Sequence, residues 1–160
     1  MTEIAARSGT AIGSLYRFFP SKEALADALL LQYTQHVISG LAELEQTVSE
    51  IATEGVADAL MDFMLALQSQ RSFAISLVEE RGGREESRLQ FRAVMRDGMA
   101  AILRKALPGL TPVKSKVAAV VVLHILKGIT TAGDEKPAMR RMLLAEIREL
   151  VRLYLVSTQP

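Results

Sequence analysis

Apolar residues recur at spacings of three or four along most of this chain, which is the periodicity of a helix with one buried face. The clearest example follows Ser21, a candidate N-cap, and predicts a long helix over 22–47. Its apolar face is formed by Leu25, Leu29, Tyr33, Val37, Leu41 and Leu44. The same pattern, interrupted by Gly and Pro, predicts further helices at 2–8, 11–18, 54–70, 72–80, 84–107, 112–131 and 137–156. Strand-like alternation is not sustained anywhere, so the predicted fold class is all-α.

Composition fits a helical, intracellular protein. Of the 160 residues 49% are hydrophobic, which is enough for a substantial core, and none is cysteine. The absence of cysteine excludes a disulfide scaffold and thiolate metal sites. The N-terminus lacks a secretory pattern, and the longest apolar run, Val117 to Leu126, is shorter than the roughly 20 residues that span a bilayer. We therefore expect a cytoplasmic protein with no membrane partner.

The last two predicted helices are apolar around most of their circumference. A helix with little polar surface needs packing partners on more than one side. Pairing of the helices at about 112–131 and 137–156 with those of a second copy, as a four-helix bundle, would cover them, so we expect a homodimer. The alternative is that both helices lie inside the core of one monomer.

The first twenty residues carry the spacing of a helix-turn-helix. Ala5 is small enough for close helix packing, Gly9 can adopt the left-handed conformation of the turn, and Leu15 points back between the helices. Charge does not single out this region, because residues 1–40 contain three basic and three acidic side chains. By itself the spacing is equally compatible with an ordinary helical hairpin.

The continuation from Leu15 to Leu25, Leu-Tyr-Arg-Phe-Phe-Pro-Ser-Lys-Glu-Ala-Leu, resembles the signature of the tetracycline-repressor (TetR) family. The matching positions are Gly9, Gly13, Ser14, Leu15, Tyr16, Phe19, Lys22 and Leu25. The close match covers about residues 2–30. The resemblance implies a helix-turn-helix DNA-binding domain with its connecting helix at 1–45, and a helical ligand-binding and dimerisation domain at 46–160.

The resemblance also assigns roles in binding double-stranded operator DNA. Thr10, Ala11 and Ile12 would lie nearest the base edges in the major groove. Ser14, Tyr16 and Lys22 would hold phosphates. The alternatives are that Tyr16 packs its ring in the core of the helix pair, that Lys22 is merely solvated and that Ile12 is buried.

The segment departs from the family pattern in several places. Thr10 replaces an apolar residue, Ile12 stands where a polar or basic residue is common, and Phe18 stands where His or Tyr is frequent. These departures affect the expected base preferences. The family also has a helix before the one that begins at Thr2, and we expect this chain to lack it.

A small-molecule effector is expected to bind among the middle helices, where aromatic and Met side chains would form an adaptable lining. The candidate lining residues are Met61, Phe63, Met64, Leu67, Phe73, Arg88, Phe91 and Met95. Arg88 could serve as the counter-ion of a carboxylate ligand. The alternatives are that the apolar residues are ordinary core and that Arg88 belongs to a surface stripe with Arg92 and Arg96.

These features together predict a ligand-responsive transcriptional repressor, released from DNA by an apolar or amphipathic effector. The competing hypothesis is a helical ligand-binding or dimerisation module that has lost DNA binding. An enzyme is not expected, because we find no catalytic constellation, and no cofactor or metal site is predicted. His36 and His124 are isolated from other ligating residues.

Overall fold

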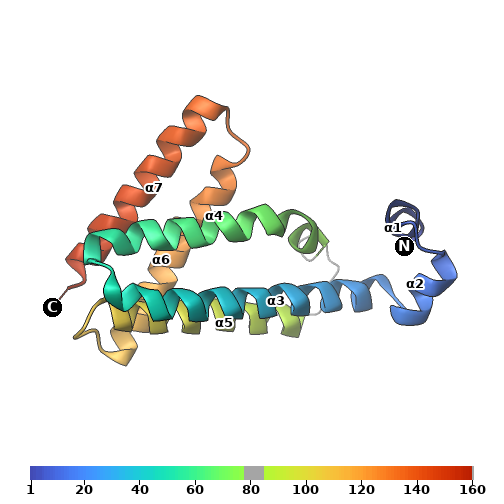
Figure 1. Ribbon diagram of the computed structural model, residues 1–160, viewed down its shortest axis with the longest axis horizontal. Coiled ribbons are helices and arrows are strands. Elements are labelled where there is room, and N and C mark those ends of the chain that lie inside the picture. Colours follow the sequence, from blue (N-terminus) through green and yellow to red (C-terminus); the bar gives the residue numbers. More distant parts are fainter. Residues whose placement is uncertain (78–84, 160) are drawn as a thin grey trace.

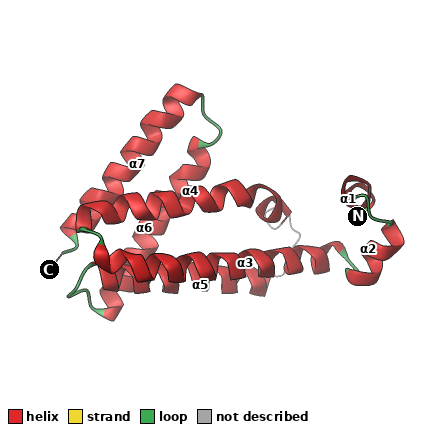
Figure 2. Ribbon diagram, viewed as in Figure 1, coloured by secondary structure: helices red, strands yellow, loops and turns green. Residues whose placement is uncertain are grey.

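The computed structural model describes residues 1–77 and 85–159, with the side chains of 53, 54 and 69–77 excepted. Within these ranges the secondary structure is helical, without strands, which confirms the all-α class (Figure 2). The α-helices are α1 (Thr2–Ser8), α2 (Ile12–Phe18), α3 (Lys22–Thr47), α4 (Thr53–Leu77), α5 (Glu85–Ala106), α6 (Pro112–Ala132) and α7 (Pro137–Ser157). A single 3₁₀ turn, η1 (Val48–Glu50), separates α3 from α4.

The two short helices α1 and α2 lie at one end of the molecule, and α3 leads from them along its whole length (Figure 1). Helix α4 runs back beside α3, and α5 packs along α3 on another side. Helix α6 packs against α5, and α7 packs against both α6 and α4. The C-terminus therefore lies at the end of the molecule opposite the short helices (Figure 1).

The main hydrophobic core is shared by α3, α4, α5, α6 and α7. Its fully buried members include Leu60, Met61, Met99, Ile102, Leu103, Leu126 and Leu155. Helices α3 and α5 approach closely at Gly98, where an added Cβ would lie 2.6 Å from Leu41 Cδ1. The second half of α3 belongs to this core through Tyr33, Val37 and Leu41. The helix that leaves the short N-terminal pair is thus built into the body.

The expected break between helices at 70 and 72 is wrong. Helix α4 continues from Thr53 to Leu77 as one element. The segment Gln68-Ser69-Gln70-Arg71-Ser72 is polar, but it contains no Gly or Pro. Polar residues alone do not remove a backbone hydrogen bond or force non-helical geometry, so the helix continues. The predicted stop at Gly82-Gly83 lies outside the described residues.

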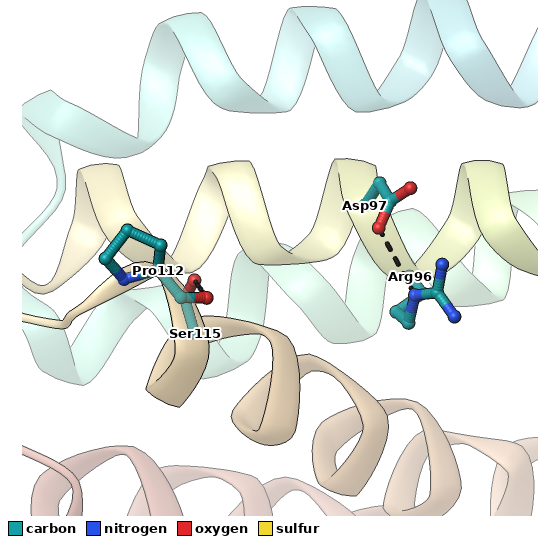
Figure 3. A network of polar contacts seen from close by, with 4 residues as sticks. All are labelled: Arg96, Asp97, Pro112 and Ser115. Atoms are coloured by element: carbon teal, nitrogen blue, oxygen red, sulfur yellow. Dashed lines mark hydrogen bonds and ion pairs between the residues drawn. The ribbon is translucent and has the colours of Figure 1, made fainter.

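The start of α6 is fixed by side-chain hydrogen bonds. The Thr111 hydroxyl accepts from the Lys114 backbone N–H at 3.3 Å, and Pro112 occupies the first turn, where its missing N–H has no cost. The buried Ser115 hydroxyl donates to the Pro112 carbonyl at 2.9 Å (Figure 3). These contacts define where α6 begins.

In the part of the chain that is described, α6 is the one helix long and apolar enough to cross a membrane by length and composition. A core helix of a soluble protein meets the same criteria. Here Ala119, Val122, Leu126 and Ile129 pack into the main core. The apolar character of α6 is accounted for in part by that packing.

Candidate functional site

The turn between α1 and α2 has the geometry that the sequence predicts. Gly9 adopts a left-handed conformation with φ 65° and ψ 18°. In this conformation the Thr10 N–H donates to the Ala5 carbonyl at 3.0 Å, which closes the end of α1. A Cβ at residue 9 would touch no neighbouring atom, but a residue with a side chain would favour a negative φ at this position. The glycine therefore fixes the angle between the two helices.

A small core holds the two helices together. Ala5 and Leu15 are buried, as predicted, and Leu25 at the start of α3 is buried as well. Ile4 and Phe19 are half-buried. With so few buried apolar groups, the orientation of α2 depends on the turn and on the start of α3 as much as on packing.

The start of α3 is capped by Ser21, again as predicted. The Ser21 hydroxyl accepts from the Ala24 backbone N–H at 3.1 Å. A backbone hydrogen bond in this first turn, and then the Ser21 hydroxyl, lower the pKa of Glu23 below its ordinary value. A carboxylate here also complements the positive end of the helix dipole. These interactions define where the long helix begins relative to α2.

The candidate DNA-contacting side chains are all on the surface. Ile12 is 43% exposed and Tyr16 is 48% exposed, so neither is confined to the small core. Ile12 and Tyr16 are four residues apart and share one face of α2. The other four are also exposed, namely Thr10, Ala11, Ser14 and Lys22.

Arg17 is a further candidate DNA-contacting residue, which the sequence pattern did not single out. It is exposed and lies two residues beyond the buried Leu15, which places it on the opposite, outward side of α2. Arg7 is paired with Glu3 at 2.8 Å, whereas Arg17 and Lys22 form no ion pair with any described residue. The spacing from Leu15 was the signal that could have identified Arg17. The free positive charges of the segment therefore flank the exposed face of α2.

A family model described as bacterial regulatory proteins, tetR family, matches residues 1–29. Residues 1–29 are therefore similar to the DNA-binding segment of that family. The match covers α1, α2 and the first two turns of α3, which are the elements just described. No curated protein matched the chain. A tetR-family protein is a transcription regulator that contacts DNA through its helix-turn-helix, and this chain has that element.

The predicted effector residues do not all meet at one place. Met61 and Met95 are buried in the main core, and Met64 packs against that core. Phe91 lies against Tyr33, with ring centroids 5.6 Å apart. Arg88 is half-buried near the start of α5, one residue after Ser87, whose hydroxyl donates to Asp27 Oδ1 on α3 at 3.0 Å. The side chain of Phe73 lies outside the described residues.

The other two predicted residues, Phe63 and Leu67, line an open groove of about 550 Å³ between α3 and α4. Its remaining lining residues are His36, Gly40, Glu43, Leu44 and Thr47 from α3, and Ala59, Asp62 and Ala66 from α4. The α3 residues of the groove were not among the predicted effector residues. These α3 residues share one helix face at spacings of three and four. A surface groove requires two helices, however, and the sequence pattern did not indicate that α3 pairs with α4.

The charged side chains of α5 that follow Arg88 lie outward. Arg92 and Arg96 are exposed, and Arg96 Nε donates to Asp97 Oδ1 at 3.2 Å (Figure 3). Of the predicted stripe, Arg88 alone is half-buried. Within the described residues no group of three His, Asp or Glu side chains could hold a metal ion.

Proposed function

We propose that this tetR-family regulator is a homodimeric repressor that binds operator DNA and is released by a small apolar or amphipathic effector. The observation that carries the DNA-binding role is the exposed face of α2, held at a fixed angle by Gly9 and flanked by free cations. A short helix presented on a rigid turn is the element that enters a major groove in helix-turn-helix proteins.

The proposed contacts follow from the positions of the side chains. Thr10, Ala11 and Ile12 are at the N-terminal end of α2, where they would face base edges. Ile12 would contact a thymine methyl group, since its exposed side chain is apolar. Phosphates would be held by Ser14, Tyr16 and Lys22, and we add Arg17 because it is exposed and without an ion pair.

Support for a homodimer comes from an apolar stripe on α6 and α7. On α6 it contains Val113, Val117 and Val120, and on α7 it contains Met142, Leu150 and Leu153; all six are 40–74% exposed. Their spacings put each trio on one side of its helix, away from the buried Leu126 and Val151. Exposed apolar surface of this extent typically marks an interaction site, and two copies would form a four-helix bundle.

The dimer would set the distance between the two DNA-binding segments. Two helix-turn-helix elements bind successive half-sites when they are about 34–36 Å apart. Helix α3 has 26 residues and would span about 39 Å, so a small rotation near its C-terminal end moves the N-terminal segment appreciably. Effector and operator would then oppose each other through one coupling free energy.

We further propose the division into a DNA-binding part at 1–45 and a ligand-binding and dimerisation part at 46–160. The role of Tyr33, Val37 and Leu41 in the main core means that α3 connects the two parts rather than separating them. Operator binding also requires the protein to be in the cytoplasm, where the bacterial chromosome is.

The dimer is tested by placing a charge in the stripe. Leu150→Asp is expected to convert the dimer into a monomer, as measured by sedimentation equilibrium, because a carboxylate would be buried without a partner. Leu89→Asp is the matched control, since Leu89 on α5 is 55% exposed compared with 53% for Leu150. A monomeric unmodified chain, or a dimer that survives Leu150→Asp, would contradict this part of the proposal.

The second candidate function is a ligand-binding module without DNA binding. It is favoured by the balanced charge of residues 1–40 and by the small core around Leu15. Salt dependence separates the two functions, because phosphate contacts give a steep decrease in affinity with salt. A chain that binds a ligand but shows no salt-dependent binding to DNA would support this candidate.

A further inference from the structure

The groove between α3 and α4 exists because small residues line it. Gly40 on α3 and Ala59 and Ala66 on α4 leave space between the helices. The ring edge of Phe63 lies against Gly40, where an added Cβ would be 2.8 Å from Phe63 Cε2. Leu44 and Leu67 complete an apolar floor. The groove thus offers an aromatic side chain and aliphatic groups in a space of about 550 Å³.

The charged groups of the groove are of one sign. Glu43 comes from α3 and Asp62 from α4, and both are exposed. The lining contains no Lys or Arg; its remaining ionisable side chain is His36. Neither carboxylate forms an ion pair with a described residue, whereas Asp58, one turn before Asp62, is paired with Arg148 at 2.8 Å. Two unpaired carboxylates therefore border an apolar, aromatic floor.

We propose that this groove binds a hydrophobic organic cation, in which a quaternary or delocalised positive charge is surrounded by apolar groups. The carboxylates of Glu43 and Asp62 attract the charge, and the face of Phe63 adds a cation–π contact. The apolar groups of the ligand cover Leu44 and Leu67. An anion of the same shape would meet two negative charges and binds more weakly.

The groove is placed to affect the DNA-binding segment. Its α3 wall, from His36 to Thr47, is the C-terminal half of the helix whose first turn carries Lys22. A ligand that separates α3 from α4 at Phe63 tilts that helix. The role of the cation as the effector rests on the proposed function, whereas its binding to the groove does not.

Two probes of nearly equal size and opposite charge test the binding, namely tetraphenylphosphonium and tetraphenylborate. Isothermal titration of the chain without DNA is expected to show the cation binding at least about tenfold more tightly than the anion. The double variant Glu43→Gln/Asp62→Asn should weaken cation binding by about fivefold or more. Because both side chains are exposed, neither change is expected to affect folding.

The matched control is Asp134→Asn/Glu135→Gln, which removes two exposed carboxylates from the turn between α6 and α7 and changes the net charge equally. It should leave cation binding unchanged. Ala66→Leu, which fills the groove from an exposed helix position, should weaken binding without altering the charge. Absence of cation binding, equal binding of the two ions, or cation binding unchanged in the double variant would overturn the proposal.

A separate DNA titration distinguishes binding of the cation to the groove from the role of the cation as effector. Cation binding that follows the expected pattern while operator affinity stays constant leaves the groove assignment intact and contradicts its effector role. Loss of operator binding on addition of the cation, prevented by Glu43→Gln/Asp62→Asn and retained in the control, supports both.

Discussion

The N-terminal helix-turn-helix and the helical body use apolar residues in opposite ways. In the first, only Ala5 and Leu15 are buried on the two short helices, while Ile12, Tyr16 and Phe18 are 43–74% exposed. In the body, five helices surround a continuous core whose central side chains, such as Leu60 and Leu103, are fully buried. Burial of apolar area dominates stability, so the body supplies the stability of the molecule. The helix-turn-helix supplies the exposed surface that we propose contacts DNA.

This contrast assigns different sensitivities to the two regions. Substitutions in the body should change global stability, whereas substitutions in the helix-turn-helix should change local order and DNA binding. Helix α3 belongs to both, because its first turn directly follows the helix-turn-helix in the chain and residues from Tyr33 onward lie in the main core. The predictions below compare equivalent substitutions on the two sides.

The largest contrast is expected for removal of a buried leucine. Leu103→Ala should lower the free energy of unfolding by about 2–5 kcal/mol, because it leaves a cavity in the centre of the body. Leu15→Ala should change global unfolding much less, but should increase amide hydrogen exchange throughout α1 and α2. Urea unfolding and exchange measured by mass spectrometry check the two effects. Equal global losses from the two variants would mean that the segments unfold as one unit.

A smaller contrast is expected for the two helix caps. Ser21 caps α3 next to the helix-turn-helix and Thr111 caps α6 in the body, with hydrogen bonds of 3.1 and 3.3 Å. Removal of each hydroxyl, as Ser21→Ala and Thr111→Ala, should lower the stability of its helix by about 1 kcal/mol. Only Ser21→Ala should also weaken DNA binding, as measured by fluorescence anisotropy. A loss of DNA affinity in Thr111→Ala would show that α6 and the DNA-binding segment are more strongly coupled than we propose.

The smallest expected effect is on the pH dependence of stability in the acid range. The pKa of Glu23 is lowered in the folded chain, so its contribution to the start of α3 is complete above the ordinary value of 4.5 and is lost as the pH falls through the lowered value. Glu23→Gln should therefore remove a small pH-dependent part of stability in the acid range. Glu149 is the body counterpart, because its hydrogen bond to Arg152 lowers its pKa in the same direction. Unfolding curves of Glu23→Gln and Glu149→Gln across that range check both, and an unchanged pH dependence in either variant would contradict the assigned cause.

The sequence predicted the helix-turn-helix more fully than the body. Gly9, Leu15 and Ser21 act through local geometry, so their spacing is sufficient to place the turn, the small core and the cap. The break expected near residue 71 was wrong, because no Gly or Pro interrupts the helix there. The groove between α3 and α4 was missed in large part, since it depends on which helices pair over a long sequence separation. Arg7 and Arg17 are both exposed, and the ion pair of Arg7 with Glu3, which the sequence analysis did not consider, distinguishes them.

The central claim is that the exposed face of α2 and the adjoining cations bind operator DNA. Fluorescence anisotropy of the chain with the promoter duplex next to its own gene, and with a scrambled duplex, tests it over a range of salt concentrations. We expect tighter binding to the promoter and a steep decrease of log affinity with log salt, in which Lys22→Gln reduces the slope by about 0.9 for the phosphate contact removed. Lys114→Gln, an exposed lysine on α6, should leave the slope unchanged. Weak binding to both duplexes, with no effect of Lys22→Gln, would contradict the account.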